Sequence, residues 1–128
     1  MRVYCSHPIR GAKGKNATIE DMRANNAKAV KLAAHWKDVL SKAFGKRVDV
    51  YVPGEHDEFV ALAHNEGYIT ERQILAIDCK ILDTCDLLLV LNEDGISYGM
   101  QVEIIHALTR GIPVLYVKDQ GEIAGRAD

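Results

Sequence analysis

A run of five apolar residues, Leu87 to Leu91, constrains the fold of this chain more than any other segment. It reads LLLVL, directly follows Asp86, and has no polar side chain on either face. Strands of this kind are typical of the centre of a parallel sheet, because helices cover both faces of such sheets. The run is far shorter than the roughly twenty residues of a transmembrane helix. It therefore predicts a buried central strand and no membrane span.

Helical and strand patterns alternate along the rest of the chain. Three further strands are predicted, at residues 2–6, 48–52 and 112–117, of which 48–52 alternates and is placed at a sheet edge. The first helix begins at Thr18, where Asp21 completes a capping box, and ends at Gly45. Three further helices are predicted, at residues 57–66, 70–84 and about 98–110. Residues 8–16, rich in glycine and basic residues, are predicted to form a loop.

This alternation predicts an α/β fold, a small doubly wound, flavodoxin-like parallel sheet of four to five strands flanked by helices. Residues 1–128 are predicted to form a single domain. Ligands of such folds bind at the carboxyl ends of the strands. The loops expected to meet at that edge follow Ser6, Val52, Leu91 and Val117.

Composition excludes several classes of protein. Sixteen Lys and Arg against eighteen Asp and Glu give a net charge of −2, without the broad basic surface that a nucleic-acid polymer requires. The three cysteines, Cys5, Cys79 and Cys85, lack the spacing of a zinc or redox site and fit a reducing cytoplasm. The five histidines have no metal-ligand spacing either. We expect a cytoplasmic protein without a metal or cofactor.

The loop after the first predicted strand carries the cations Arg10, Lys13 and Lys15 around Gly11 and Gly14. It matches neither the Walker A pattern nor the dinucleotide-binding G-x-G-x-x-G pattern. Its position and charge are compatible with a phosphate contact. They are equally compatible with a solvated flexible connection.

The segment from Ser97 to Glu103, SYGMQVE, lies where the predicted helix that follows the buried strand begins. The Ser97 hydroxyl and the amides near Gly99 would then face the expected ligand edge, where the helix dipole favours an anion. Glu103, about one turn into the helix, would suit a nucleophile or a ligand-binding carboxylate. The alternative is a helix-capping serine followed by a solvent-facing glutamate.

Two more side chains are candidates for the site. Asp78 flanks the apolar stripe of its helix, where partial burial at a pocket rim would raise its pKa, although many such aspartates are simply solvated. His7 lies at the tip of the first predicted strand, inside the expected ligand zone.

Three motifs together resemble the nucleoside 2-deoxyribosyltransferase superfamily over about residues 2 to 117. The motifs are Tyr4-Cys5-Ser6-His7-Pro8-Ile9-Arg10-Gly11, Asp78 with Asp86, and Ser97-x-Gly99-x-x-x-Glu103 followed by Ala107 and Gly111-Ile112-Pro113-Val114. The superfamily includes nucleoside deoxyribosyltransferases and 2'-deoxynucleoside 5'-phosphate N-hydrolases. Both act on the bond between deoxyribose and base.

The resemblance implies a role for each motif. Glu103 matches the nucleophile that forms a covalent glycosyl-enzyme, Asp78 the carboxylate that helps to protonate the departing base, and Tyr4 the tyrosine that positions the nucleophile. Such chemistry needs an anion near an oxocarbenium-like centre and a proton donor for the leaving group. The implied substrate-binding residues are His7, Ile9, Arg10, Gly11, Ser97 and Gly99. At His7 the chain departs from the glycine that is usual in the family.

Ser97 favours the N-hydrolase branch, because the transferases carry an aspartate there, six residues before the nucleophile, that grips a free 5'-hydroxyl. A serine tolerates a 5'-phosphate that a carboxylate would repel. We therefore expect hydrolysis of deoxynucleoside monophosphates in a cytoplasmic homodimer. A deoxyribosyltransferase and a non-catalytic nucleotide-binding module remain alternatives. A phosphoribohydrolase of the lysine-decarboxylase-like group is disfavoured because its paired-glycine loop is missing.

Overall fold

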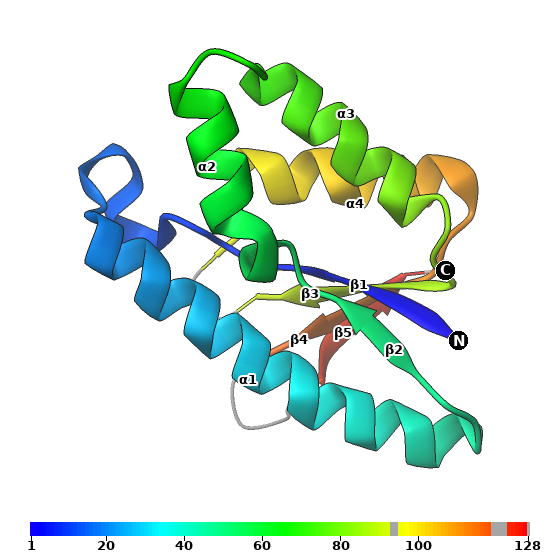
Figure 1. The fold of residues 1–128 in the computed structure, drawn as a ribbon. Coiled ribbons are helices and arrows are strands. Elements are labelled where there is room, and N and C mark those ends of the chain that lie inside the picture. Colours follow the sequence, from blue (N-terminus) through cyan, green and yellow to red (C-terminus); the bar gives the residue numbers. More distant parts are fainter. Residues whose placement is uncertain (93–94, 119–122, 128) are drawn as a thin grey trace.

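The sheet has five strands in the order β2-β1-β3-β4-β5 (Figure 1). The structure is a computed structural model that describes residues 1–92, 95–118 and 123–127. The strands are β1 (Arg2–Ser6), β2 (Asp49–Tyr51), β3 (Leu87–Leu91), β4 (Val114–Val117) and β5 (Ile123–Ala127). The first four are parallel, and β5 runs antiparallel to β4. The predicted α/β class with a small, mostly parallel, flavodoxin-like sheet is confirmed.

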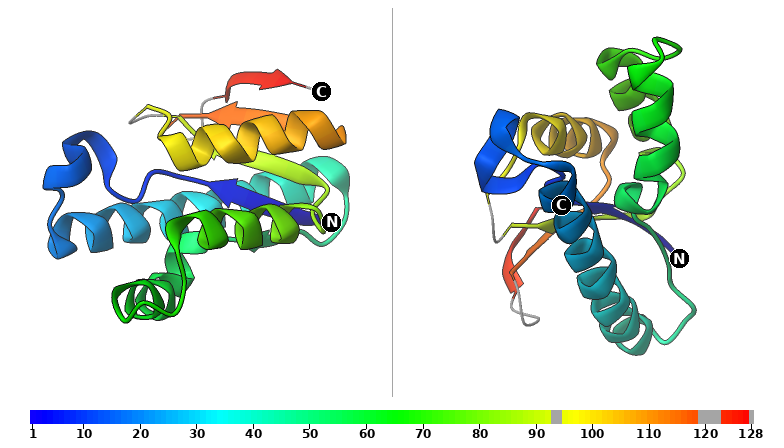
Figure 2. Two further views of the ribbon diagram at one scale, coloured as in Figure 1. Left: turned by 90° about the horizontal axis from the view of Figure 1, so that it is seen from above. Right: turned by 60° about the vertical axis from the view of Figure 1, so that its left-hand side comes forward.

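Helices cover both faces of this sheet. They are α1 (Ile19–Phe44), α2 (Asp57–Asn65), α3 (Glu71–Leu82) and α4 (Tyr98–Arg110), with the short 3₁₀ helices η1 (Gly11–Asn16) and η2 (Pro53–His56). Helix α1 lies along one face, and α3 and α4 lie on the opposite face (Figures 1 and 2). Among the described residues, no helix has the length and apolar content that a membrane span requires.

Local sequence explains where α1 and α3 begin. At the start of α1, Thr18 Oγ1 accepts from the Asp21 amide while the Asp21 carboxylate accepts from the Thr18 amide, which is the predicted capping box. Thr70 and Gln73 make the same reciprocal pair at the start of α3. Each pair satisfies two amides that have no acceptor within the helix.

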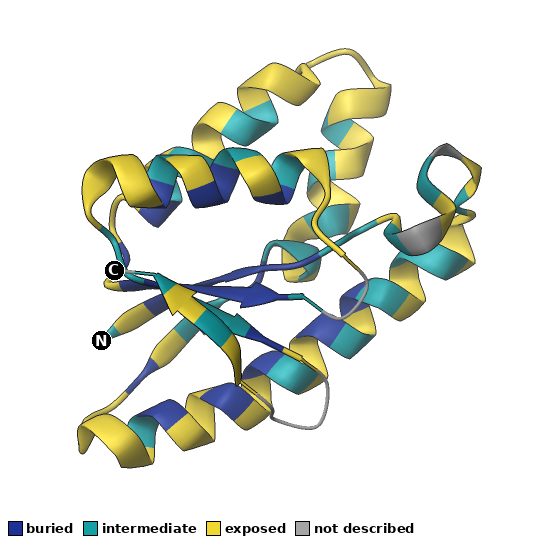
Figure 3. Ribbon diagram, turned by 180° about the vertical axis from the view of Figure 1, so that it is seen from behind, coloured by how far each residue is buried: buried dark blue, intermediate teal, exposed yellow. Residues whose placement is uncertain are grey.

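The core has two layers because β1 and β3 are buried on both faces. On the α1 side, alternate strand residues pack on Trp36 and its neighbours, and on the α4 side they pack on Met100 and Ile104. Every residue of β3 is buried, as the LLLVL run predicts. Figure 3 shows the buried residues concentrated in the central strands and on the sheet-facing sides of the helices.

Several elements differ from the sequence-based expectation, among them β4, which begins at Val114 rather than at residue 112, and α3, which ends at Leu82 rather than at residue 84. Strand β5 is not predicted, because three of its five residues are exposed and only pairing with β4 defines it as a strand. Residues 11–16 form η1 rather than an irregular loop, with Gly11 and Gly14 at positive φ. Strand β2 spans only three residues, although the flanking Val48 and Val52 are buried.

The central strand gives a stability test. Leu89 is fully buried in the core layer beneath α1, so Leu89→Ala removes packed atoms that the rigid sheet cannot replace. We expect a loss of about 2–5 kcal/mol in the free energy of unfolding. Leu108→Ala, at a half-exposed position on α4, is the matched control and should cost less than about 1 kcal/mol. Equal losses in urea denaturation would contradict the assignment of the core.

Candidate active site

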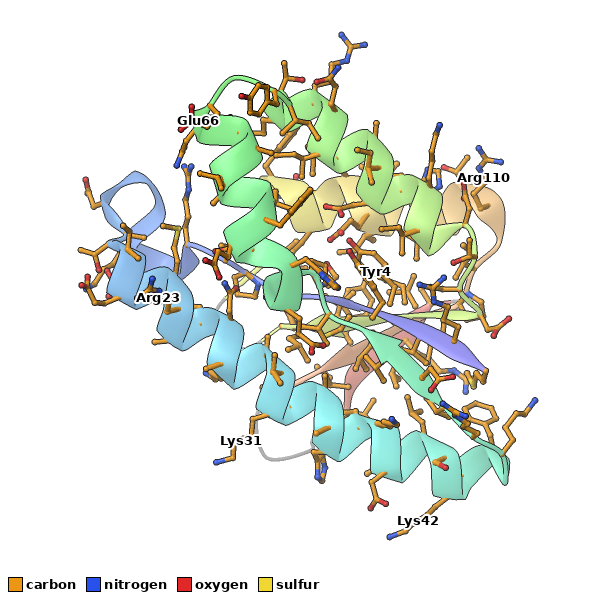
Figure 4. The ribbon with its side chains drawn as sticks, viewed as in Figure 1. Tyr4, Arg23, Lys31, Lys42, Glu66 and Arg110 are labelled. Carbon is orange, nitrogen blue, oxygen red and sulfur yellow. The ribbon has the colours of Figure 1, made fainter. Side chains whose placement is uncertain are left out.

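Strand β1 brings two hydroxyl groups to the sheet face beneath α4. Tyr4 and Ser6 are two residues apart, so their side chains lie on the same face of the strand. Both are fully buried. Figure 4 shows Tyr4 between the sheet and helices α3 and α4.

The two hydroxyls bind one carboxylate, that of Glu103 on α4. Glu103 Oε1 accepts a hydrogen bond from Ser6 Oγ at 2.7 Å, and Oε2 accepts one from the Tyr4 hydroxyl. The glutamate is 6% exposed. Each carboxylate oxygen therefore has a donor, and the alternative of a solvent-facing Glu103 is wrong.

Burial dominates the electrostatics of Glu103. Desolvation raises the pKa of Glu103 to about 7, and the charge of Asp78 acts in the same direction, whereas the hydroxyls of Tyr4 and Ser6 lower it. Burial, followed by the charge of Glu103, raises the pKa of Tyr4 well above its usual value, so the phenol stays protonated. Tyr4 is therefore a permanent donor to a carboxyl group that is close to its ionisation point at neutral pH.

Asp78, on α3, is the second carboxyl group of the site. It is partly buried, and desolvation raises its pKa to about 6, as expected for a carboxylate at a pocket rim. Its charge also raises the pKa of Tyr4 and of Glu103, which places it within electrostatic reach of both. No hydrogen bond to the Asp78 side chain occurs within the described residues.

An aromatic row extends the site toward the edge of the sheet. Tyr51 pairs in register with Tyr4, and the centroids of the two rings are 5.4 Å apart. The His56 ring stacks on Tyr51 at 5.1 Å and 15°. Sequence reasoning missed Tyr51, His56 and Ser6. Strand alternation from Tyr4 could have identified Ser6, whereas the rings depend on strand register.

Ser97 begins α4, and its hydroxyl accepts from the Met100 amide at 3.3 Å. The helix-cap interpretation of this serine is thus confirmed, while its predicted substrate role stays a prediction. Gly99 faces α3, since a β-carbon there would lie 3.5 Å from Leu75 Cδ2. The start of α4 therefore packs against the neighbouring helix.

An open groove of about 780 Å³ runs between α3 and α4. It is lined by Thr70, Glu71, Arg72, Leu75, Ala76, Cys79, Tyr98 and Val102. The two helices run in the same direction, because Leu75 lies beside Gly99 at one end and Asp83 bonds His106 at the other. The groove thus runs between the helices that carry the two carboxyl groups, although neither carboxyl group lines it.

The predicted binding residues on the first loop lie apart from Glu103. His7 follows Ser6 and turns to the opposite face, where Gly54 donates to its Nε2. The Ile9 carbonyl accepts from Asn25 on α1, and Gly11 packs against the same amide. Arg10 is exposed. The structure therefore places His7, Ile9 and Gly11 against α1 and η2 rather than beside the carboxylates.

In the same loop, the structure describes the side chain of Lys13 but not that of Lys15. Lys13 pairs with Asp21 at 3.1 Å, and the Lys15 side chain lies outside the described residues. A phosphate contact in this loop therefore stays a prediction. The described residues contain no group of three or more His, Cys, Asp or Glu that could hold a metal ion.

Comparisons with models of protein families, with curated proteins and with solved structures found no match to this chain.

The raised pKa of Glu103 gives a test that needs no substrate. Since folding raises this pKa from 4.5 to about 7, Glu103 favours the folded state most at low pH, and this contribution is lost as the pH rises through 7. Glu103→Gln should therefore gain stability relative to wild type between pH 5 and 8, by up to about 3 kcal/mol at about 1.4 kcal/mol per pKa unit. Urea denaturation at several pH values measures the difference.

The control for this measurement is Glu66→Gln, since Glu66 is an exposed glutamate at the end of α2. Its stability difference from wild type should not change between pH 5 and 8. A pH-independent difference for Glu103→Gln as well would show that Glu103 ionises normally.

Proposed function

We propose that this protein cleaves the N-glycosidic bond of 2'-deoxynucleoside 5'-monophosphates, with Glu103 as the nucleophile. One observation carries the proposal, a buried carboxylate with a hydroxyl donor on each oxygen and a second carboxyl group within electrostatic reach. Strongly perturbed carboxyl groups that lie together are characteristic of catalytic sites. The motifs shared with the deoxyribosyltransferase superfamily supply the substrate class.

Glu103 would attack the anomeric carbon of the sugar. One of its oxygens forms the bond to C1' while the bond from C1' to the base breaks, and the electron pair of that bond leaves with the base. Tyr4 and Ser6 hold the carboxylate in one orientation through the strand that carries them. Water then cleaves the glycosyl ester and releases Glu103.

Asp78 would supply the proton that the departing base requires. Its pKa of about 6 leaves about a tenth of the Asp78 side chains protonated at pH 7, and no donor among the described residues favours its charged form. Glu103 has two such donors. The different surroundings therefore suit the two carboxyl groups to different roles, as in other enzymes with paired carboxylates.

The start of α4 would bind the 5'-phosphate. The Ser97 oxygen is engaged by the Met100 amide, but its hydroxyl hydrogen can still be donated. The amides of Tyr98 and Gly99, in the first turn, have no acceptor within the helix, and the positive end of the helix favours an anion. A homodimer in the cytoplasm is part of the same proposal and rests on the family resemblance.

The direct test incubates the protein with nucleosides and nucleoside monophosphates, with and without an acceptor base, and measures released base. We expect release from deoxynucleoside monophosphates, abolished in Glu103→Gln and reduced about a hundredfold or more in Asp78→Asn. Glu66→Gln is the control and should keep wild-type rates.

Each other outcome identifies a different function. Exchange of bases without hydrolysis would indicate a transferase. Nucleotide binding without either reaction would indicate a binding module. Wild-type rates in Glu103→Gln would show that another group is the nucleophile.

The substrate's 5' group gives a second test at Ser97. Charge-assisted hydrogen bonds contribute about 1.5–3 kcal/mol each, so wild type should favour a monophosphate over its nucleoside by tenfold or more in kcat/KM. Ser97→Asp keeps a helix-capping side chain but sets a carboxylate against the phosphate, and we expect it to reverse the preference. Ser97→Asn, an uncharged cap of the same shape, is the control and should keep it. An unchanged preference in Ser97→Asp would reject the phosphate site.

A further inference from the structure

His7 joins the end of β1 to the turn that follows β2. It is 6% exposed, and its Nε2 lies 3.0 Å from the Gly54 amide, which donates to it. Gly54 belongs to η2, forty-seven residues further along the chain. The contact therefore links two carboxyl-end loops of the sheet directly.

In one tautomer of the neutral His7 ring, both ring nitrogens take part in a hydrogen bond. Nδ1 lies 3.3 Å from the Pro8 carbonyl, which can only accept, so Nδ1 carries the hydrogen and Nε2 is free to accept from Gly54. Burial lowers the pKa of His7, while the Pro8 carbonyl and the charge of Asp57 on α2 oppose this. A leucine side chain at position 7 would be close in size to the imidazole ring but could not accept the hydrogen bond from the Gly54 amide.

The α-carbon of Gly54 is also closely packed. A β-carbon at this position would lie 2.8 Å from Asn26 Oδ1 and 2.9 Å from His7 Cε1, both too close for real contacts. Asn26 is buried on α1. The backbone of the turn is thus fixed between the first strand and the first helix.

The same turn carries the aromatic row to Tyr4. His56 ends η2 and stacks on Tyr51, Tyr51 lies against Tyr4, and Tyr4 donates to Glu103. Movement of Gly54 would therefore shift the His56 ring, two residues later, relative to Tyr51.

We propose that His7 is a positioning residue of the candidate site, which holds the turn at Gly54 so that His56 stays stacked on Tyr51 beside Tyr4. The stacking consequence rests on the geometry alone, whereas the catalytic consequence rests on the proposed function. The imidazole replaces the glycine usual in the resembled family, and it points away from the Glu103 face of the sheet. The imidazole therefore contacts the turn at Gly54 and does not occupy the space beside Glu103.

The test compares His7→Leu, which removes the acceptor, with His7→Gln, whose Oε1 can reach the place of Nε2. The readout is the proton NMR shift of the His56 ring, because the stacked Tyr51 ring shields those protons. We expect the shielding to be lost in His7→Leu and retained in His7→Gln. His64→Leu, at an exposed histidine of α2, is the control and should retain it. Retained shielding in His7→Leu would overturn the proposal.

A measurement on the unmodified protein covers the case in which His7→Leu does not fold. The nitrogen-15 shifts of His7 should show hydrogen on Nδ1 and none on Nε2, and a hydrogen on Nε2 would overturn the proposal.

Where wild type releases base, kcat/KM should fall about tenfold or more in His7→Leu and recover in His7→Gln, and an unchanged value would overturn the catalytic consequence. If wild type releases no base, the proposed function fails while the NMR result still decides the role of His7.

Discussion

The hydrogen bonds from Tyr4 and Ser6 to Glu103 are the constraint on which the candidate site depends. Removing a carboxylate from water is costly, and proteins usually compensate with a cation or leave the group protonated. Here the partners are two uncharged hydroxyls, which fix the orientation of the carboxylate without neutralising it. Burial and these two donors act in opposite directions and leave the pKa of Glu103 at about 7, so that part of the population is charged at neutral pH, as the proposed nucleophile requires.

A single strand serves both faces of the sheet. Tyr4 and Ser6 meet α4, while His7 turns toward α1 and reaches Gly54. Because β1 lies between β2 and β3, its side chains have a helix-covered layer on either side. Tyr4 and Ser6 of β1 therefore hold the Glu103 carboxylate, and His7, the residue after the strand, makes the contact with the neighbouring turn.

Sequence patterns could predict the parts of the structure that depend on local or periodic signals. The LLLVL run identifies the central strand, and Thr18 with Asp21 identifies a helix start. Strand β5 could not be predicted, because its residues are mostly exposed and its identity comes from pairing with β4. The contact of Tyr51 with Tyr4 was equally inaccessible, since it requires the parallel register of β1 and β2. The stack of His56 on Tyr51 depends on the turn at η2.

The same distinction between local sequence signals and contacts made only in the fold applies to the site residues. Asp78 could be singled out because it flanks an apolar stripe, and Glu103 because it lies about one turn into the helix that follows the buried strand. The direction of His7 follows from strand alternation, but the partner it meets there depends on how α1 packs on the turn. Sequence patterns thus indicated candidate residues, whereas only the fold showed which of them lie together.

In the proposed reaction, the contrast between the two carboxyl groups affects which of them holds a proton when substrate is bound. A substrate that covers the site excludes water and raises both pKa values. The hydroxyls of Tyr4 and Ser6 oppose this rise at Glu103, whereas burial acts on Asp78 without opposition. Without substrate, the pKa of Glu103, about 7, still lies above that of Asp78, about 6, so the proton of the pair resides mainly on Glu103. The proposed reaction therefore requires that substrate binding raise the pKa of Asp78 above that of Glu103. The donors to Glu103 and the lack of donors to Asp78 among the described residues both act in that direction.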